Sequence, residues 1–413
     1  MEDRQLYAKL LGIEYPWLIS KVQVDMAAER IDVWVEEAAG AKFACVSCRQ
    51  EASVYDHTAT QVWRHLDTCQ CRTYIHASLP RTNCPTDGIK QVRAPWAEPR
   101  SQFTRLFEAR LINALKECDV TGVTRLMATS WDQTWGVMMR AVTRGLARKR
   151  RRMPAYLGID EKSVGKGHNY ESIVCDLDRS TVEYVVDDRE KESLESYFRQ
   201  FKPKQLKRIK AIAMDMWEPY VLATHACVPK AGEKIVFDRF HATKQVTAAV
   251  DKVRRAEHKA LAKDGDERLK GTKYLWLRNE ENIPEWRREE FAEVKSAELR
   301  TSRAWAIKES LRKFWSYTCA RCVEKYFQAW YFWATHSRIS PMIAAARTLK
   351  RHLPNLLTYF KHRITNATSE GINSKIQMIK MMACGYRNRD HYRAAIYFHC
   401  GGLDLYPRFT TPL

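Results

Sequence analysis

The chain has 413 residues, with 69 lysine and arginine residues against 49 aspartate and glutamate residues and a formal net charge of +20. Its hydrophobic fraction of 45 % excludes wholesale disorder, and its length predicts two to four domains at roughly 100–200 residues each. It contains neither an uncharged apolar run of ~18–20 residues nor a signal-peptide pattern at its start, so we expect a cytoplasmic protein whose first candidate partner is a polyanion.

Strand-like segments and cysteines dominate the first hundred residues, and the cysteine spacing is typical of a metal site. Cys45 and Cys48 have the Cys-x-x-Cys spacing with which two thiolates of one turn reach a tetrahedral ion. Cys84 begins a second turn of similar shape, with Asp87 where a fourth cysteine or a histidine is usual. Because cytoplasmic thiols stay reduced, this pattern predicts one structural Zn²⁺ on Cys45, Cys48, Cys84 and Asp87.

Two points about the cysteines stay open at this stage. The fourth zinc ligand is either the aspartate or one of Cys69, Cys71 and His76, and the alternative to a zinc site is a set of buried reduced cysteines. Cys319 and Cys322 repeat the spacing in a helical run without a companion turn, so we interpret them as a helix pair that lies partly in the core.

A basic helical segment follows from Phe103 onwards. Residues 121–128 are compatible with a short helix, and Ser130 with Gln133 matches a capping box that starts a second helix. Along this second helix an apolar face recurs at steps of four, three and four residues, made of Trp131, Trp135, Met138 and Val142.

The opposite face of the second helix carries side chains that suit DNA recognition. Gln133, Arg140 and Arg144 lie there, and glutamine and arginine read adenine and guanine edges in the major groove. The segment therefore predicts a helix-turn-helix that binds double-stranded DNA, with a run of cations on the phosphates: Arg148, Lys149, Arg150, Arg151 and Arg152. The alternative is an ordinary amphipathic helix with a solvated basic face.

After Pro154 the sequence alternates between strand-like and helical runs, as in an α/β domain. The strand-like runs lie near residues 155–164, 171–177, 181–187, 209–215 and 234–238, with a helical run at 190–201. Two apolar runs lead to an aspartate, Asp160 and Asp215, as expected for adjacent buried strands. Glu370 lies in the first turn of a capped amphipathic helix over residues 366–386, off its apolar stripe.

Three carboxylates in one cleft would indicate a metal-dependent reaction. They repel each other unless divalent cations neutralise them, and ligands that are all oxygen favour Mg²⁺ or Mn²⁺. Such a site suits two-metal phosphoryl chemistry, in which one ion activates the nucleophile and the other stabilises the leaving oxygen. The alternative for a lone aspartate at a strand end is a turn former.

The region of residues 246–361 is charged, helical and rich in tryptophan. Trp305 has basic residues at positions −2 and +3, which favours a DNA contact in which an unpaired base stacks on the indole. The alternative is that the tryptophans form the core of a helix bundle: Trp276, Trp286, Trp305, Trp315, Trp330 and Trp333.

Several motifs are spread over nearly the whole chain: the cysteine turn at 45–48, Gly158-Ile-Asp160-Glu161, Asp215-Met-Trp217, Asp238-Arg-Phe-His241 and Asn366-Ala-Thr-Ser-Glu370-Gly-Ile-Asn373. Together they resemble the ISL-three family of bacterial insertion-sequence transposases. The resemblance implies that Asp160, Asp215 and Glu370 are the catalytic residues of a DDE active site and the ligands of two Mg²⁺ or Mn²⁺ ions. Asp238 and His241 match an Asp-x-x-His motif of the family, and with Asn373 they are expected to support the site.

The resemblance also implies the order of the domains. We expect a multidomain chain with an N-terminal zinc-binding module, an all-α helix-turn-helix domain and an RNase H-like α/β catalytic domain. The long gap between Asp215 and Glu370 fits an all-α insertion that interrupts the catalytic domain. The expected ranges are 1–97 for the zinc-binding module, 98–153 for the helix-turn-helix, 154–245 for the first catalytic part, 246–361 for the insertion and 362–413 for the second catalytic part with the C-terminal tail.

The function implied by the resemblance is transposition. A transposase of this kind binds the terminal inverted repeats of its own element as a homodimer on paired ends, cleaves the strands and joins them to target DNA. It works in the bacterial cytoplasm at the nucleoid and needs no membrane. Two alternatives stay open here: a DNA-binding repressor on an inactive transposase scaffold, and an RNase H-like nuclease without strand transfer.

Overall fold

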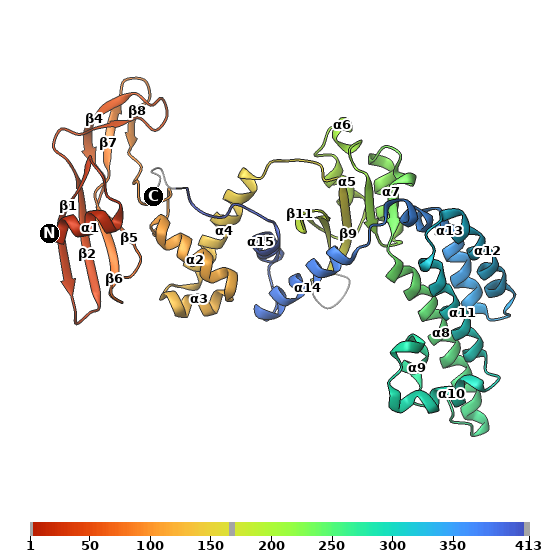
Figure 1. The fold of residues 1–413 in the computed structure, drawn as a ribbon. Helices are drawn as coiled ribbons and strands as arrows, with labels where there is room; N and C mark the ends of the chain where they lie inside the picture. Colours follow the sequence, from red (N-terminus) through yellow and green to blue (C-terminus); the bar gives the residue numbers. More distant parts are fainter. Residues whose placement is uncertain (1–2, 165–169, 409–413) are drawn as a thin grey trace. The chain divides into compact units, whose positions relative to one another are not determined.

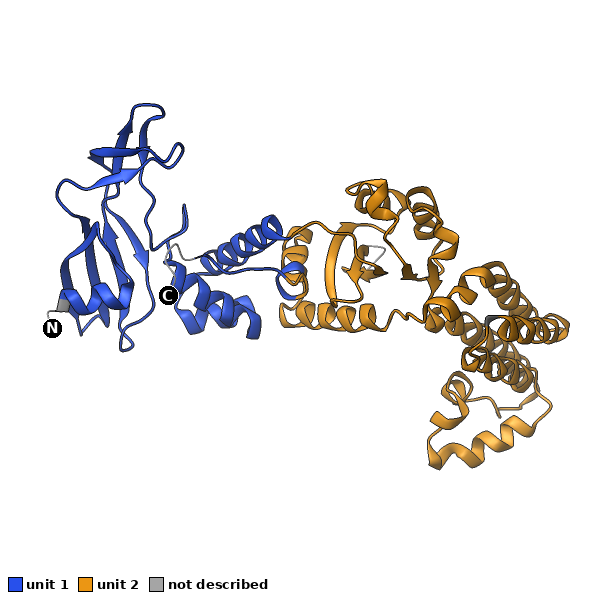
Figure 2. Cartoon of the chain, turned by 45° about the horizontal axis from the view of Figure 1, so that its top comes forward, with its two compact units in different colours: residues 1–149, 397–399, 403–413 blue, residues 150–396, 400–402 orange. Residues whose placement is uncertain are grey.

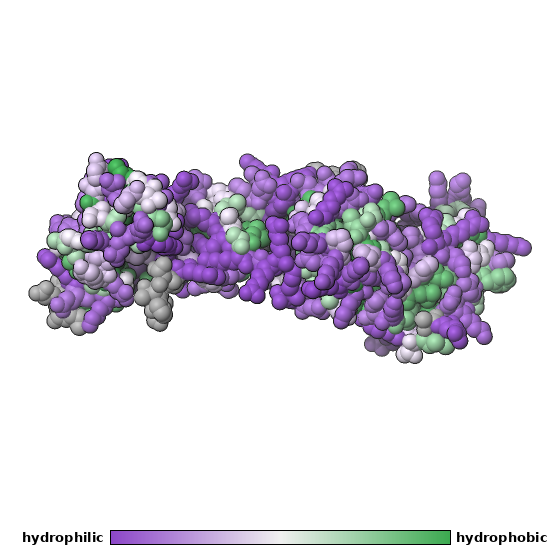
Figure 3. Space-filling view, turned by 90° about the horizontal axis from the view of Figure 1, so that it is seen from above, coloured by the Kyte–Doolittle hydropathy of each residue, from purple (hydrophilic) through white to green (hydrophobic). Residues whose placement is uncertain are grey.

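The computed structural model describes residues 3–164 and 170–408, which form two compact units. Residues 1–149, 397–399 and 403–413 make up unit 1, and residues 150–396 and 400–402 make up unit 2 (Figure 2). Hydrophobic residues on the face seen in Figure 3 form small separate patches among hydrophilic ones. None of the described helices has the length and apolar character needed to cross a bilayer.

The N-terminal part of unit 1 contains one helix and two four-stranded sheets (Figure 1). The first sheet has the order β1-β2-β6-β5, and apolar residues alternate along β2, so that Ile31, Val33 and Val35 are buried on one face. The second sheet has the order β3-β4-β7-β8. The bounds are α1 (Asp3–Leu11), β1 (Trp17–Asp25), β2 (Arg30–Glu37), β3 (Lys42–Ala44), β4 (Glu51–His57), β5 (Gln61–Arg64), β6 (Arg72–Ala77), β7 (Pro80–Cys84) and β8 (Gly88–Gln91).

Three helices follow in unit 1, α2 (Arg105–Glu117), α3 (Val120–Met127) and α4 (Trp131–Arg148). Each begins after a residue whose side chain accepts a hydrogen bond from a backbone N–H: Thr104, Asp119 and Ser130. The capping box of Ser130 and Gln133 that the sequence predicts is present at the start of α4. These caps fix where the helices begin.

The predicted apolar face of α4 is only partly buried. Trp135, Met138 and Val142 are buried, whereas Trp131 is 43 % exposed. The Trp131 ring stacks on that of Trp135, with centroids 5.4 Å apart. The predicted stripe is therefore exposed at the first residue of the helix and buried from Trp135 onwards.

The C-terminal segment of residues 403–406 belongs to unit 1, whereas the sequence places it with the catalytic domain. The Nζ atom of Lys116 donates a hydrogen bond to the hydroxyl of Tyr406 at 2.7 Å. Gly145 makes room for the segment, because an added Cβ would lie 2.7 Å from the Cβ of Leu403. Lys116 and Tyr406 are 290 positions apart, and no local sequence pattern reports such a contact.

Unit 2 is centred on a five-stranded sheet of order β11-β10-β9-β12-β13. β9, β10 and β11 are antiparallel neighbours, whereas β12 runs parallel to both β9 and β13. All residues of β12 and β13 are buried, and all five predicted strands are present. The bounds are β9 (Tyr156–Ser163), β10 (Tyr170–Asp176), β11 (Thr181–Asp187), β12 (Ala211–Met214) and β13 (Ile235–Phe237), with α5 (Lys191–Phe198), α6 (Pro203–Leu206) and α7 (Glu218–Cys227).

A block of helices, α8 to α13, lies between β13 and α14 in the chain and shares one continuous core with the sheet. The expected boundary at residue 246 falls inside α8, because this helix runs without a break from Arg239 to Leu261. The hydroxyl of Thr358 on α13 donates to the carbonyl oxygen of Ile235 at 2.6 Å, which joins the block to the sheet. The bounds are α8 (Arg239–Leu261), α9 (Lys273–Leu277), α10 (Arg288–Ser296), α11 (Arg300–Arg312), α12 (Ala320–His336), α13 (Ser340–His362), α14 (Ala367–Met382) and α15 (Arg389–Cys400).

Trp305 is part of the core of this helical block and is 3 % exposed, so its predicted contact with DNA is wrong. Its ring packs edge-on against Phe291, with centroids 5.1 Å apart. The flanking cations are also used inside the fold, because Lys308 donates to the carbonyl oxygen of Arg278 at 2.6 Å and Arg303 donates to a backbone carbonyl oxygen at 2.8 Å. The bundle-core alternative is correct for the three buried tryptophans, Trp276, Trp305 and Trp330.

Trp305→Ala is expected to lower the free energy of unfolding by roughly 3–5 kcal/mol, the usual cost of truncating a buried aromatic side chain. Trp286→Ala is the matched control, because Trp286 lies in the same helical block and is 81 % exposed. The control should change the free energy of unfolding by no more than about 0.5 kcal/mol. Urea unfolding followed by circular dichroism measures both variants, and equal losses would contradict the core position of Trp305.

Candidate functional site

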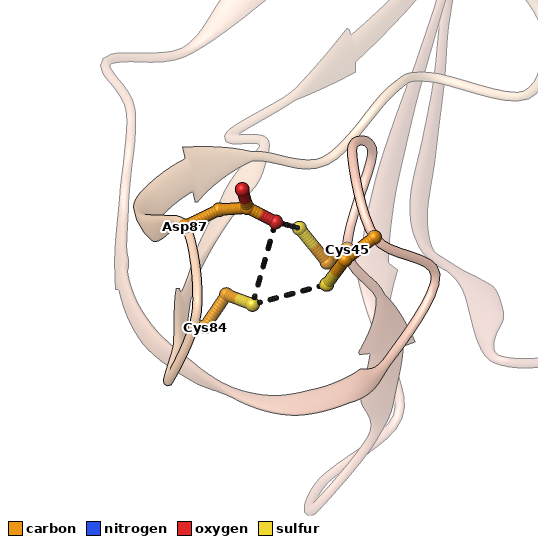
Figure 4. Close-up of side chains that lie close together, drawn as sticks. Cys45, Cys84 and Asp87 are labelled. Atoms are coloured by element: carbon orange, nitrogen blue, oxygen red, sulfur yellow. Dashed lines mark hydrogen bonds between the residues drawn. The ribbon is translucent and has the colours of Figure 1, made fainter.

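The four zinc ligands that the sequence predicts come together beside the second sheet of unit 1, and Figure 4 shows Cys45, Cys84 and Asp87 among them. Cys45 follows β3, Cys84 ends β7, and Asp87 lies in the turn to β8. The Cys45 thiol is 3.4 Å from Oδ2 of Asp87, and the thiols of Cys48 and Cys84 are also 3.4 Å apart. One ligand atom from each of the four residues lies within 4.8 Å of the others, as a tetrahedral ion requires.

Three thiols and one carboxylate suit Zn²⁺, and the other candidates for the fourth ligand lie elsewhere. Backbone N–H groups in the turn lower the pKa of the Cys84 thiol, which favours the thiolate that a metal needs. Cys69 is exposed, and Cys71 packs in the core of the first sheet. The Nε2 atom of His76 lies 2.5 Å from a carboxylate oxygen of β2. The geometry thus favours Asp87.

Cys319 and Cys322 are both exposed at the start of α12, so the interpretation that they lie partly in the core is wrong. Cys319 is the N-cap residue of α12, and backbone N–H groups of the first turn lower the pKa of its thiol. Among the described residues, no third metal-ligating side chain joins them. The pair therefore gives no second zinc site in the described part of the chain.

Contacts within unit 1 occupy much of the α4 face that the sequence predicts to read DNA. Glu108 of α2 is fully buried, and its carboxylate accepts hydrogen bonds from Arg140 at 3.0 Å and from Arg144 at 3.1 Å. Arg144 also donates to the carbonyl oxygen of Leu405 at 2.6 Å and is 12 % exposed. Gln133 takes part in the capping box, and its Nε2 atom donates a hydrogen bond to Oε1 of Gln102, in the loop before α2, at 3.1 Å.

In this structure Arg140 and Arg144 pair with Glu108, and their contact with base edges stays a prediction. A buried carboxylate must be paired, and these two arginines provide the pairing for Glu108. The helical period correctly puts the arginines on one face, but it does not show that a neighbouring helix supplies an acidic partner for that face.

The basic run after α4 contains both paired and exposed cations. Arg148 donates to a carbonyl oxygen of the C-terminal segment at 2.6 Å, and Arg152 donates to a buried carboxylate of β10 at 2.6 Å. Lys149 is the C-cap residue of α4 and is half-buried. Arg150 and Arg151 are exposed, which makes them the best placed of the five for contact with a phosphate backbone.

Three aspartates stand in register across the sheet of unit 2. Ile159 of β9 pairs with Met214 of β12, and Met214 pairs with Phe237 of β13. In each case the next residue along the chain is an aspartate: Asp160, Asp215 and Asp238. Because β12 is the parallel neighbour of both other strands, the three aspartates lie side by side at one part of the sheet.

His241, in the first turn of α8, lies beside two of these aspartates. Its Nδ1 atom is 2.8 Å from Oδ1 of Asp215 and 3.3 Å from Oδ2 of Asp238. Burial lowers the pKa of His241, but the hydrogen bonds with the two carboxylates outweigh burial and raise the pKa to about 10. The two carboxylates therefore favour the protonated form of the imidazole.

Asp160 lies in a crowded acidic environment. Burial and the nearby charge of Asp215 raise the pKa of Asp160 to about 7. The side-chain amide of Asn373 on α14 donates to Oδ2 of Asp160 at 2.5 Å, and the backbone N–H of Glu161 donates to its Oδ1 at 2.8 Å. A divalent cation would offset both the burial of the Asp160 carboxylate and the nearby charge of Asp215, and oxygen donors suit Mg²⁺ or Mn²⁺.

A close approach between α14 and β9 brings Asn373 to Asp160. Asn366 and Ser369 of this interface are each 1 % exposed. A Cβ atom at Gly158 would lie 2.1 Å from Oγ of Ser369, so glycine is required at this position of β9.

Glu370 is on the same helix and is exposed in its first turn. At about 100° per residue it projects about 40° from Asn366 and about 60° from Asn373 around the helix axis. It therefore stands at the border of the helix face that packs on β9. Within the described residues, its carboxylate forms no metal-sized cluster with Asp160 or Asp215, and its role as a ligand stays a prediction.

Sequence reasoning missed a charged and aromatic group that borders the aspartates. Arg189 pairs with Glu161 at 3.2 Å, and its guanidinium carbon lies 4.3 Å from the ring centre of Tyr170 and 4.5 Å from that of Trp217. The indole N–H of Trp217 donates to the carbonyl oxygen of Arg189 at 2.9 Å. The signal that points to Trp217 is its place two residues after a strand-end aspartate.

Three family models match successive parts of the chain. Residues 157–396 match a model described as a transposase, and residues 92–142 match the helix-turn-helix domain of transposase family ISL3. Residues 41–87 match the zinc-finger of transposase IS204/IS1001/IS1096/IS1165. The first match includes the aspartate cluster of unit 2, and the third includes all four candidate zinc ligands.

The chain is also similar to named transposases along most of its length. It is 27 % identical over 354 residues to the transposase for insertion sequence element IS1001 of Bordetella parapertussis, with 84 % of each chain covered. It is 26 % identical over 420 residues to the transposase for insertion sequence element IS1557 of Mycobacterium tuberculosis, with 94 % of this chain and 93 % of the relative covered. Since the transposase model alone matches more than half of the chain, this protein belongs to the ISL3 family of transposases.

Proposed function

We propose that this transposase cleaves DNA strands at the ends of its insertion sequence and joins them to target DNA by a DDE mechanism in unit 2. The observation that carries the proposal is the register that places Asp160, Asp215 and Asp238 side by side. The transposase match over residues 157–396 supports it, because that match includes this cluster and Glu370.

The sheet of unit 2 supports an RNase H-like catalytic domain. β9, β10 and β11 form an antiparallel set in chain order, and β12 and β13 extend the sheet in parallel on the other side of β9. The helices from α8 to α13 separate the strand-end aspartates from Glu370 in the chain. They would be the insertion in this domain, packed on the sheet through the shared core.

Asp160 and Asp215 would hold Mg²⁺ or Mn²⁺, two ions per active site, and Glu370 would add the third carboxylate. The ions would supply positive charge for phosphodiester chemistry and relieve the repulsion that contributes to the raised pKa of Asp160. Asn373 keeps the Asp160 carboxylate oriented through its amide. His241 would keep Asp215 oriented, because its Nδ1 atom lies 2.8 Å from Oδ1 of the carboxylate.

Unit 1 would bind the terminal inverted repeats through α2, α3 and α4. The helix-turn-helix match over residues 92–142 and the exposed cations that follow α4 support this role. Two copies on paired ends would act as a homodimer, in the bacterial cytoplasm at the nucleoid. Zn²⁺ on the four clustered ligands would be structural, because the protein supplies all four positions.

Arg150→Ala with Arg151→Ala is expected to weaken binding to cognate and scrambled duplexes equally, because phosphate contacts carry no sequence information. The slope of log affinity against log salt should fall by about 0.9 for each phosphate that the variant no longer neutralises. Lys259→Ala with Lys263→Ala is the matched control, because it removes two exposed charges, one in the last turn of α8 and one in the 3-10 turn that follows it. Fluorescence anisotropy over a range of salt concentrations measures both, and an unchanged slope would exclude the two arginines as phosphate contacts.

The proposed activity is tested with purified protein and a linear duplex that carries the repeats flanking its reading frame. With Mg²⁺ or Mn²⁺ we expect strands cleaved at the repeat boundary and products joined to a second DNA. End-specific binding without cleavage in either metal would favour a repressor on an inactive scaffold. Cleaved but never joined strands would favour a nuclease without strand transfer.

A further inference from the structure

Two aromatic residues occupy equivalent positions beside the aspartates. Trp217 comes two residues after Asp215, and Phe240 comes two residues after Asp238. Because β12 and β13 are parallel and in register up to these aspartates, both aromatic residues start at the same edge of the sheet. Trp217 is the N-cap residue of α7, and Phe240 lies in the first turn of α8.

Both rings are exposed to solvent, and contacts with neighbouring residues hold them in place. Phe240 is 58 % exposed, and its backbone N–H donates to the Asp238 carboxylate at 3.3 Å. Its ring meets the His241 ring at nearly a right angle, with centroids 5.5 Å apart. Trp217 is 37 % exposed and is held by its indole hydrogen bond to the backbone of Arg189. The structure thus presents two oriented aromatic surfaces to solvent.

The surroundings of these rings indicate which ligand would cover them. The neighbours of the two rings are charged or polar side chains: Asp215, Asp238, His241 and Arg189. The rings therefore do not belong to an extended apolar face of the kind that docks a protein helix. A nucleobase has an apolar π-face and polar edges, and it is joined to a phosphate that cations attract. A nucleotide therefore suits an exposed aromatic ring that has charged side chains beside it.

We propose that Phe240, supported by Trp217, stacks on an unpaired nucleobase of the DNA strand end that the active site handles. The inference rests on the proposed function and gives the stacking role predicted for Trp305 to residues that are exposed. Phe240 is a positioning residue, because it would hold the strand and not touch the reacting phosphate. Stacking of one base on an aromatic side chain affects binding by roughly 5- to 150-fold.

The test is a double-mutant cycle between protein and DNA, measured as the dissociation constant for a pre-cleaved repeat end without added Mg²⁺ or Mn²⁺. Omitting these ions separates strand holding from the metal-dependent reaction and leaves the structural zinc in place. Phe240→Leu removes the ring but keeps an apolar side chain, and Phe240→Trp restores an aromatic face. Phe332→Leu is the matched control, because Phe332 is 63 % exposed, lies on α12 and also contacts a histidine ring. Each protein is measured on ends with one abasic nucleotide at successive terminal positions.

We expect one abasic position that weakens binding by the parent roughly 5- to 150-fold and leaves binding by Phe240→Leu unchanged. Phe240→Trp and Phe332→Leu should behave like the parent. Additive losses at every position, or equal behaviour of Phe240→Leu and Phe332→Leu, would overturn the inference alone. A parent protein with no end-specific binding would overturn the proposed function and this inference with it.

Discussion

Asp160→Asn, Asp215→Asn and Glu370→Gln are each expected to slow strand cleavage on the order of 10³-fold or more, which corresponds to roughly 4 kcal/mol of activation free energy. The amides keep the size and most hydrogen bonds of the carboxylates but lose the charge that a divalent cation needs. End binding should stay nearly unchanged, because the helix-turn-helix belongs to unit 1. Gel analysis of end cleavage in Mg²⁺ and Mn²⁺, beside a binding titration, measures the two effects separately.

Asp264→Asn is the matched control for these substitutions. Asp264 is an exposed carboxylate in the short 3-10 turn that follows α8 and has no place in the proposed chemistry. Its amide variant should cleave like the parent. Near-normal cleavage by any one of the three active-site variants would remove that residue from the proposed triad.

The structure offers two candidates for the third carboxylate ligand, Glu370 and Asp238. Asp238 stands in register with the two predicted aspartates and shares His241 with Asp215, whereas Glu370 is exposed on α14. Asp238→Asn should reduce cleavage less than Glu370→Gln if Asp238 only supports Asp215 through the histidine. The opposite order would assign the third ligand to Asp238 and leave Glu370 outside the metal site.

Local sequence patterns predicted the elements that depend on neighbours in the chain. The capping box at Ser130, the five strands of unit 2 and the aspartates at strand ends all follow from spacing over a few residues. The in-register position of Asp160 and Asp215 follows because both come after apolar strands that pair in parallel. Cys45, Cys48 and Cys84 form two turns whose ligand spacing is equally local.

Features that depend on partners distant in the sequence could not be predicted from local patterns. Arg140 and Arg144 lie on one face of α4 as predicted, but their partner Glu108 is buried on another helix. Trp305 has the cationic neighbours of a DNA contact, yet those cations bind backbone carbonyl oxygens of its own block. A helical period identifies which residues share a face and does not identify what covers that face.

The zinc cluster should be essential for the fold of the second sheet of unit 1. We expect elemental analysis of the purified chain to give one zinc ion per protein. The sheet is small and contributes only Phe43 and Val54 to the hydrophobic core of unit 1, so the metal would add the stability that this limited packing does not supply. Structural zinc in small modules contributes roughly 10–16 kcal/mol of apparent binding free energy, so its removal should unfold the sheet.

Cys84→Ser is expected to lose the ion and to make residues 41–91 sensitive to limited proteolysis, while unit 2 keeps its own core. Cys69→Ser is the matched control, because Cys69 is an exposed cysteine of the same module outside the cluster. Zinc content and protease sensitivity of this control should equal those of the parent. A parent chain that resists protease in this region without any bound metal would contradict the site.

The prediction of a zinc site names Asp87 as its fourth ligand. Its Oδ2 atom lies 3.4 Å from the Cys45 thiol and 3.8 Å from the Cys84 thiol, whereas His76 is engaged by Asp32. Asp87→Ala should therefore weaken zinc binding in a competition titration with a chromophoric chelator, and His76→Ala should leave it unchanged. Three thiolates would still hold the ion, so Asp87→Ala should lose less affinity than Cys84→Ser. A larger loss of zinc affinity in His76→Ala than in Asp87→Ala would assign the fourth ligand to the histidine. The His76 side chain on β6 would then have to turn away from the carboxylate of Asp32 on β2.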